Sequence, residues 1–224
     1  MAGLEIRLSR GFDFCMDVLI FLLITFVLAF SVILHEWAHG YIALSKGDPT
    51  AKLTGRLTLN PIPHIDIFGT VLLPLLTWFL GHFIIAYAKP VPVNPIYFKS
   101  PRRDMMMVAA AGPVMNLLIA ILSAIPLRLH QQEWILLPSA IYLALFYAVH
   151  INVFLAVLNL IPIPPLDGSR IIKGWISTEA AERLDKIEPY GFAIIMLLFY
   201  LDFFRLIMDP LCSMALKLIL GFKI

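Results

Sequence analysis

Long stretches without a charged residue constrain this chain more than any other feature. Residues 18–34, 67–88, 105–127 and 134–166 contain no Asp, Glu, Lys or Arg, and a helix needs roughly 17 to 25 apolar residues to cross the hydrocarbon layer of a membrane. A fifth, weaker stretch at 189–208 is interrupted by Asp202 and Arg205. Only 14% of all residues are charged, against about 25% in soluble domains. The sequence therefore predicts an all-α polytopic membrane protein with four to five membrane-embedded helices.

We expect one membrane-embedded domain over residues 1–224, because no repeat, low-complexity tract or linker divides the chain. Apolar and polar residues alternate in 51–60, which predicts a short β-strand. The expected segments are a helix at about 14–45, a strand at 51–60, a re-entrant hairpin or span at 67–88, spans at 105–127 and 138–160, a turn at 161–169 and C-terminal helices at 170–224.

Charge and cysteine content exclude several other classes. The formal net charge is only +2, and no basic stripe interleaves with aromatic residues, so we expect no nucleic-acid partner. Cys15 and Cys212 lie far apart in apolar runs, which favours packing roles over a disulfide or a cysteine metal site. The lipid bilayer is the partner that the composition predicts.

The residues His35-Glu36-Trp37-Ala38-His39 carry the clearest chemical signal. Two histidines four residues apart lie about 40° from one another around a helix, so both imidazoles can reach one metal ion. This is the spacing of zinc proteases, in which the intervening glutamate acts as general base. A chance match, or histidines satisfied by hydrogen bonds, is the alternative. Ionisable residues are costly inside a membrane, which favours a function.

A catalytic zinc ion usually has three protein ligands and one open position. The best candidate for the third ligand is Asp167, because it ends the longest apolar stretch, where the run Asn159-Leu160-Ile161-Pro162-Ile163-Pro164-Pro165-Leu166-Asp167-Gly168 interrupts regular helix. The alternative is that Asp167 only caps the polar helix that follows.

Together, the His35 to His39 motif and the run from Asn159 to Gly168 resemble the site-2 protease family of intramembrane zinc metalloproteases. The segment Ala111-Gly112-Pro113-Val114-Met115-Asn116 also resembles the central core helix of that family. The resemblance covers roughly residues 14 to 175, and one extra residue lies between Pro162 and Leu166 relative to the family pattern. No PDZ or nucleotide-sensing domain is recognised, so we expect a compact, core-only member.

The resemblance implies a fold, a cofactor and a reaction. It implies one zinc ion per chain held by His35, His39 and Asp167, with Glu36 as base, and hydrolysis of peptide bonds within or near transmembrane segments of protein substrates. Asn159 would match the residue that stabilises the oxyanion. The expected location is a bacterial or archaeal plasma membrane, where a membrane adaptor or regulator is a further possible partner.

The two motifs must reach the same side of the membrane if they share a metal ion. If every apolar stretch crossed the membrane once, the two motifs would lie on opposite sides. We therefore expect residues 67–88 to form a re-entrant hairpin, because Gly69, Pro74 and Gly81 divide this stretch into short pieces. With this hairpin, most lysines and arginines of the loops fall on one side. Positive residues mark the cytoplasmic side, and the zinc site is therefore expected nearer the cytoplasmic face.

The strand predicted at 51–60 also suggests how a substrate binds. An unwound substrate could pair with the edge of the predicted strand, which makes Leu53, Arg56, Leu57 and Thr58 candidate substrate-binding residues. Asn116 is expected to hydrogen-bond across helices. A membrane transporter and an inactive metal-binding scaffold are the alternative functions.

Overall fold

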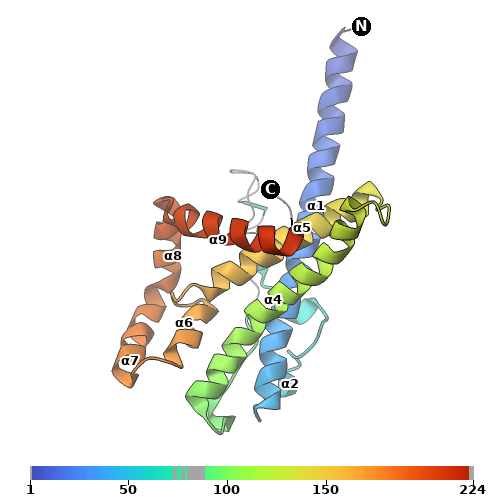
Figure 1. Ribbon diagram of the computed structural model, residues 1–224. Coiled ribbons are helices and arrows are strands. Elements are labelled where there is room, and N and C mark those ends of the chain that lie inside the picture. Colours follow the sequence, from blue (N-terminus) through green and yellow to red (C-terminus); the bar gives the residue numbers. More distant parts are fainter. Residues whose placement is uncertain (1, 73–74, 77–78, 80–88, 222–224) are drawn as a thin grey trace.

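The chain is described by a computed structural model over residues 2–72, 75–76, 79 and 89–221 (Figure 1). Within these residues every regular element is a helix, so the predicted all-α class is confirmed. The long helices are α1 (Ala2–Ser45), α4 (Pro101–Gln131), α5 (Ser139–Leu160) and α9 (Phe203–Leu220), and the shorter ones are α2 (Thr50–Leu53), η1 (Ile62–His64), η2 (Ile67–Leu72), η3 (Pro95–Tyr97), α6 (Asp167–Lys173), α7 (Thr178–Ile187), η4 (Glu188–Tyr190) and α8 (Gly191–Tyr200).

Three helical segments are long and apolar enough to cross a membrane: Val18–Ser45, Pro101–Gln131 and Ser139–Leu160. They correspond to the predicted segments 14–45, 105–127 and 138–160. Their outward faces remain apolar, as at Phe26 with 72% of its surface exposed and Leu122 with 57%. Such faces suit lipid rather than water. The described residues thus support a membrane protein with three candidate spans, fewer than the four to five predicted.

Helix α4 lies at the centre and packs against α1, α5, α6 and α9 (Figure 1). Where α4 meets α5 and α9, two alanines of α4 face branched residues of the other two helices, and such small residues let helix backbones approach closely. This core comprises Ala120, Ala124, Leu127, Val149, Val153, Leu216 and Leu220. This core holds α4, α5 and α9 together.

Helices α1 and α4 run in opposite directions. Going along α1, His35 contacts Asn116, His39 contacts Val108 and Lys46 lies 3.7 Å from Asp104. The numbering on α4 falls as that on α1 rises, so the end of α1 adjoins the start of α4. The connection between them therefore leaves and returns at the same end of the helix pair.

The predicted re-entrant segment 67–88 lies mostly outside the described residues, but its two ends are described. The backbone N–H of Lys89 donates to the carbonyl of His64 over 3.1 Å. The Arg56 guanidinium donates to the carbonyls of Pro63, Lys89 and Pro90. The chain that enters after His64 thus emerges beside the same residue. We call residues 63–64 and 89–90 the neck of this segment.

The predicted strand at 51–60 is wrong. Asp48 Oδ1 accepts the backbone N–H of Thr50 over 2.9 Å and starts the helical turn α2. The N–H groups of Arg56 and Leu57 then both donate to the carbonyl of Ala51, over 2.8 and 3.0 Å. A strand must satisfy its backbone on a neighbouring strand, and this segment instead satisfies those groups locally. The alternation of side chains was therefore not evidence of a sheet.

Candidate metal centre

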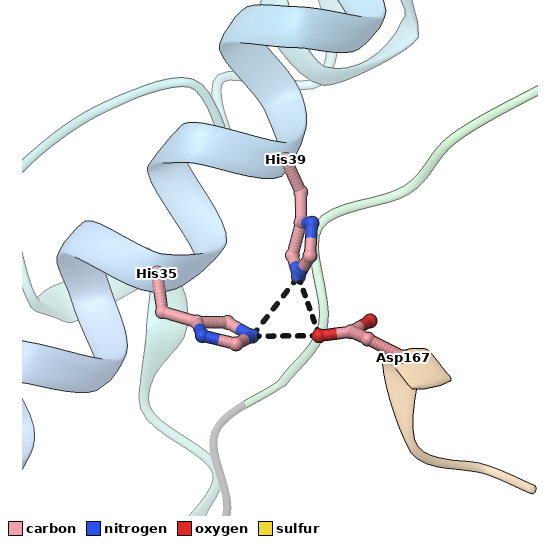
Figure 2. A group of neighbouring side chains, drawn as sticks. All are labelled: His35, His39 and Asp167. Atoms are coloured by element: carbon pink, nitrogen blue, oxygen red, sulfur yellow. Dashed lines mark hydrogen bonds and ion pairs between the residues drawn. The ribbon is translucent and has the colours of Figure 1, made fainter. Parts of the chain in front are cut away.

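Two turns of α1 and the first residue of α6 bring three ligand atoms together (Figure 2). His35 Nε2 and His39 Nε2 lie 3.0 Å apart, and each lies near Asp167 Oδ2, at 3.1 and 3.2 Å. All three side chains are buried, with 7 to 8% of each residue exposed. The three residues that the sequence nominated as metal ligands thus meet at one point.

The local sequence explains how Asp167 reaches the histidines. Helix α5 ends at Leu160 because Ile161 is extended, and the proline-rich turn leads directly into α6. A side chain on Gly168 would meet the carbonyl oxygens of Leu160 and Ile161 at 2.3 and 2.4 Å. Only a glycine lets the start of α6 pack on the end of α5 this closely, and this packing places Asp167 beside the two histidines.

Each histidine is held through its other ring nitrogen. His35 Nδ1 lies 2.6 Å from Asn116 Oδ1, and His39 Nδ1 lies 2.7 Å from the carbonyl oxygen of Val108. Both partners are acceptors, so both Nδ1 atoms carry the proton. The Nε2 atoms of neutral imidazoles then present lone pairs. Outer partners of this kind orient the histidines of metal sites.

These protonation states test whether a metal fits. Two nitrogen lone pairs and a carboxylate oxygen without a hydrogen-bond donor therefore face one another at 3.0 to 3.2 Å. Three such acceptors repel unless a cation lies among them. The donor set of nitrogen and carboxylate ligands suits zinc.

Gly112 on α4 leaves the space beside these ligands. A side-chain carbon at this position would lie 2.5 Å from the imidazole atoms of both His35 and His39. Any residue other than glycine would displace the rings from the shared point. Gly112 belongs to the motif that resembles the core helix of the family, but the motif alone does not predict this role.

Glu36 lies beside the ligand group and is half-buried. Its Oε2 accepts the backbone N–H of Val91 over 2.8 Å. Val91 directly follows the neck, so the loop that comes after residues 67–88 orients this carboxylate. Glu36 is therefore held as an acceptor next to the three ligands without joining them.

Asn159 behaves differently from the ligands. Its Nδ2 donates to the carbonyl of Leu155 on its own helix over 3.0 Å, and the residue is half-buried. Asn116 does hydrogen-bond across helices, as predicted, to His35 and to Asn152. The part played by Asn152 and Ser31 was missed, although Ser31 lies one helical turn before His35 and shares its face.

The four candidate substrate-binding residues make different contacts in the structure. Arg56 is committed to the carbonyls of the neck. Leu57 packs near Gly40, where an added side chain would meet Leu57 at 3.1 Å. The carbonyl oxygen of Thr58 accepts a hydrogen bond from His64 Nε2 over 2.9 Å. Leu53 is 78% exposed. These contacts make three of the four part of the loop's own structure.

Zinc proteases commonly hold their metal with a helix that carries two histidines four residues apart and a third ligand from another element. The same arrangement stands here among helices long enough to cross a membrane. The fold and the site together define the class of the protein, a membrane-embedded metalloprotease.

Comparison with known proteins gives the family. The model of peptidase family M50 matches residues 126–201, which include the Asp167 turn. The chain is 38% identical over 196 residues to "Putative zinc metalloprotease YwhC" of Bacillus subtilis, covering 86% of this chain and 85% of the relative. It is 29% identical over 182 residues to "Putative zinc metalloprotease Rip2" of Mycolicibacterium smegmatis, covering 80% of this chain and 67% of the relative.

The chain belongs to peptidase family M50, the site-2 protease family, and is an intramembrane zinc metalloprotease. The resemblance recognised in the two sequence motifs is thereby confirmed. No solved structure matches the chain significantly.

Proposed function

We propose that His35, His39 and Asp167 hold one zinc ion and that Glu36 is the general base for hydrolysis of peptide bonds within or near transmembrane segments. The observation that carries this assignment is the convergence of three buried acceptor atoms at 3.0 to 3.2 Å. Their burial beside membrane-spanning helices favours a substrate that is itself in the membrane. No described feature of the chain favours a transporter or an inactive scaffold.

When bound, zinc would polarise the scissile carbonyl and lower the pKa of a water molecule toward about 7. Glu36 would take the proton of the attacking water on its carboxylate and deliver it to the leaving amine. The Val91 N–H, which donates to Glu36 Oε2, leaves the other carboxylate oxygen for this transfer. The role of this pair is to hold the base in one orientation before the substrate arrives.

Two assignments stay predictions of the sequence analysis. Asn159 Nδ2 carries two N–H groups, and its hydrogen bond to the carbonyl of Leu155 uses one of them, which leaves the second for an oxyanion. Substrate contacts by Leu53, Arg56, Leu57 and Thr58 can no longer rest on a strand edge. For Arg56, its hydrogen bonds to the neck support a role in holding the loop that carries Val91.

The substrate class is tested with protein reconstituted in lipid vesicles. We expect cleavage of a single-span protein whose transmembrane helix contains helix-breaking residues, with product masses that place the cut inside or at the edge of the span. A zinc chelator should stop it. The matched control is the same substrate with an unbroken leucine-rich span, which we expect to be cut more slowly because its helix shields the peptide bonds. Cleavage confined to soluble unfolded proteins would contradict the proposal.

We also propose that the zinc site opens toward the cytoplasmic face of the plasma membrane. Lys46 at the end of α1 lies near Asp104 at the start of α4, and Arg102 and Arg103 also lie in that first turn of α4. This basic end of the helix pair supports a cytoplasmic location.

The orientation predicts that residues 46 and 99 are on the same side. In a chain whose native cysteines are replaced, single cysteines at these positions should react with a membrane-impermeant maleimide only after the cytoplasmic face is exposed. A cysteine replacing Glu133, at the far end of α4, is the matched control and should react from the outside. Labelling of 46 and 99 from opposite faces would contradict both the orientation and the re-entrant segment.

A further inference from the structure

A buried line of hydrogen bonds runs from His35 away from the metal centre and through three helices. Asn116 Oδ1 faces His35 Nδ1 at 2.6 Å, and Asn116 Nδ2 donates to Asn152 Oδ1 over 2.8 Å. Asn152 Nδ2 then donates to Ser31 Oγ over 2.7 Å. Asn116 and Asn152 are fully buried and Ser31 is 1% exposed. We call His35, Asn116, Asn152 and Ser31 the relay.

The far end of the relay fixes its direction. The Asn152 amide lies 2.8 Å from the carbonyl oxygen of Ala148, and the Ser31 hydroxyl donates to the carbonyl oxygen of Val27 over 2.7 Å. A carbonyl oxygen can only accept, so the end of Asn152 that faces Ala148 must be its NH₂ group. The Asn152 oxygen therefore faces Asn116, whose own oxygen must then face His35.

The two histidines differ in how they are held. His39 Nδ1 faces a backbone carbonyl, that of Val108, which cannot present a donor. His35 Nδ1 faces a side-chain amide, which could turn over and present NH₂ instead. That orientation would require a lone pair on Nδ1 and would move the His35 proton to Nε2, where a ligand needs its lone pair. His35 therefore needs a second device that keeps Asn116 from turning.

We propose that Asn152 is this device, a positioning residue that holds the carbonyl oxygen of Asn116 toward His35 and so keeps the Nε2 lone pair of His35 available to zinc. The proposal rests on the proposed function, because the relay has a purpose only if His35 is a ligand. The backbone carbonyl of Ala148 on α5, three hydrogen bonds from the His35 ring, and that of Val27 on α1, four hydrogen bonds from it, thus set the proton position on this ring.

The first test is Asn152→Leu, which keeps the approximate shape and removes both ends of the amide. Asn116 is then free to turn, and zinc affinity measured by competition with a chromophoric chelator should fall about 10-fold, as for other outer partners of metal-bound histidines. Asn152→Ser serves if the leucine variant does not purify as a monodisperse, helical protein. This measurement needs no substrate and no activity.

The second test separates proton positioning from general stabilisation. An aspartate at 116 can only accept through its carboxylate, so it holds the His35 proton on Nδ1 without any relay. In Asn116→Asp alone, the new carboxylate faces the oxygen of Asn152, and affinity should fall. In the double variant with Asn152→Leu this repulsion is gone, and affinity should return to within about threefold of the wild type. Asn152→Leu is thus expected to lower zinc affinity when residue 116 is asparagine and to raise it when residue 116 is aspartate.

The outcomes distinguish the relay from the proposed function. A double variant that binds zinc more weakly than either single variant would show that Asn152 only stabilises the fold and would overturn the relay. Undiminished affinity in folded Asn152→Leu would overturn it as well, while wild-type zinc binding and its loss in Asp167→Ala would leave the proposed function intact. A folded wild type that binds no zinc would overturn both.

Discussion

Replacing Asp167 with alanine should remove the bound zinc from a protein that still folds. Wild type is expected to hold about one zinc ion per chain, and Asp167→Ala to lose at least about 90% of it under the same purification, since a catalytic site has only three protein ligands. His35 and His39 remain together on α1, but two neutral imidazoles leave the cation without its anionic ligand. The measurement is zinc content per chain by mass spectrometry of detergent-purified protein.

The chain offers a matched control in Asp104. This carboxylate is buried to the same extent, 8% exposed against 7% for Asp167, but it accepts the backbone N–H of Ser100 and lies near Lys46. Asp104→Ala therefore removes a buried carboxylate away from the metal centre and should keep its zinc. Equal zinc loss in both variants would mean that the ion responds to instability, and undiminished zinc in Asp167→Ala would move the third ligand elsewhere.

Glu36→Gln should abolish cleavage while leaving zinc in place. Glutamine has the same shape and can still accept the N–H of Val91 through its amide oxygen, but it cannot take a proton from water. General-base catalysis contributes typically 10²- to 10⁴-fold, so we expect turnover to fall by about that factor or more. The measurement is the initial rate of cleavage in vesicles, on the substrate whose transmembrane helix contains helix-breaking residues, together with the zinc content of the variant.

A control outside the site is Glu133→Gln, just beyond the C-terminal end of α4. This variant should retain both turnover and zinc. Because Glu36→Gln is expected to keep its zinc, a low rate cannot be explained by a lost metal. Turnover within a few-fold of wild type in the zinc-loaded variant would remove Glu36 from the role of base. Loss of zinc in this variant would show instead that Glu36 supports the ligand group.

The membrane helices and the metal ligands could be predicted for different reasons. Long apolar stretches have few folds available besides spanning helices, because a membrane leaves no water to satisfy an exposed backbone. His35 and His39 could be predicted from their spacing alone, because four residues on a helix return a side chain to the same face. Asp167 required the additional observations that it ends the longest apolar stretch and that the proline-rich run before it interrupts regular helix.

The loop between α1 and α4 shows where sequence patterns failed. The alternation in 51–60 satisfied the period of a strand, but the Asp48 cap and the bonds to Ala51 hold the backbone in turns. Arg56, predicted to bind the substrate, joins the two ends of the neck, and its contact with a substrate stays a prediction. Both outcomes depend on hydrogen-bond partners that are distant or are chosen among several local options, and residue type alone does not select them.

By itself the sequence determined the solvent of this protein, its helical class and the residue types able to hold zinc, because each follows from local composition and spacing. Only the tertiary structure decided that Gly112 leaves room for both imidazoles, that Val91 orients Glu36, and that Asn116, Asn152 and Ser31 form one directed line. The physical reason is that a hydrogen bond has a direction and a short range. Its donor and acceptor are assigned only when α1, α4 and α5 are packed against one another.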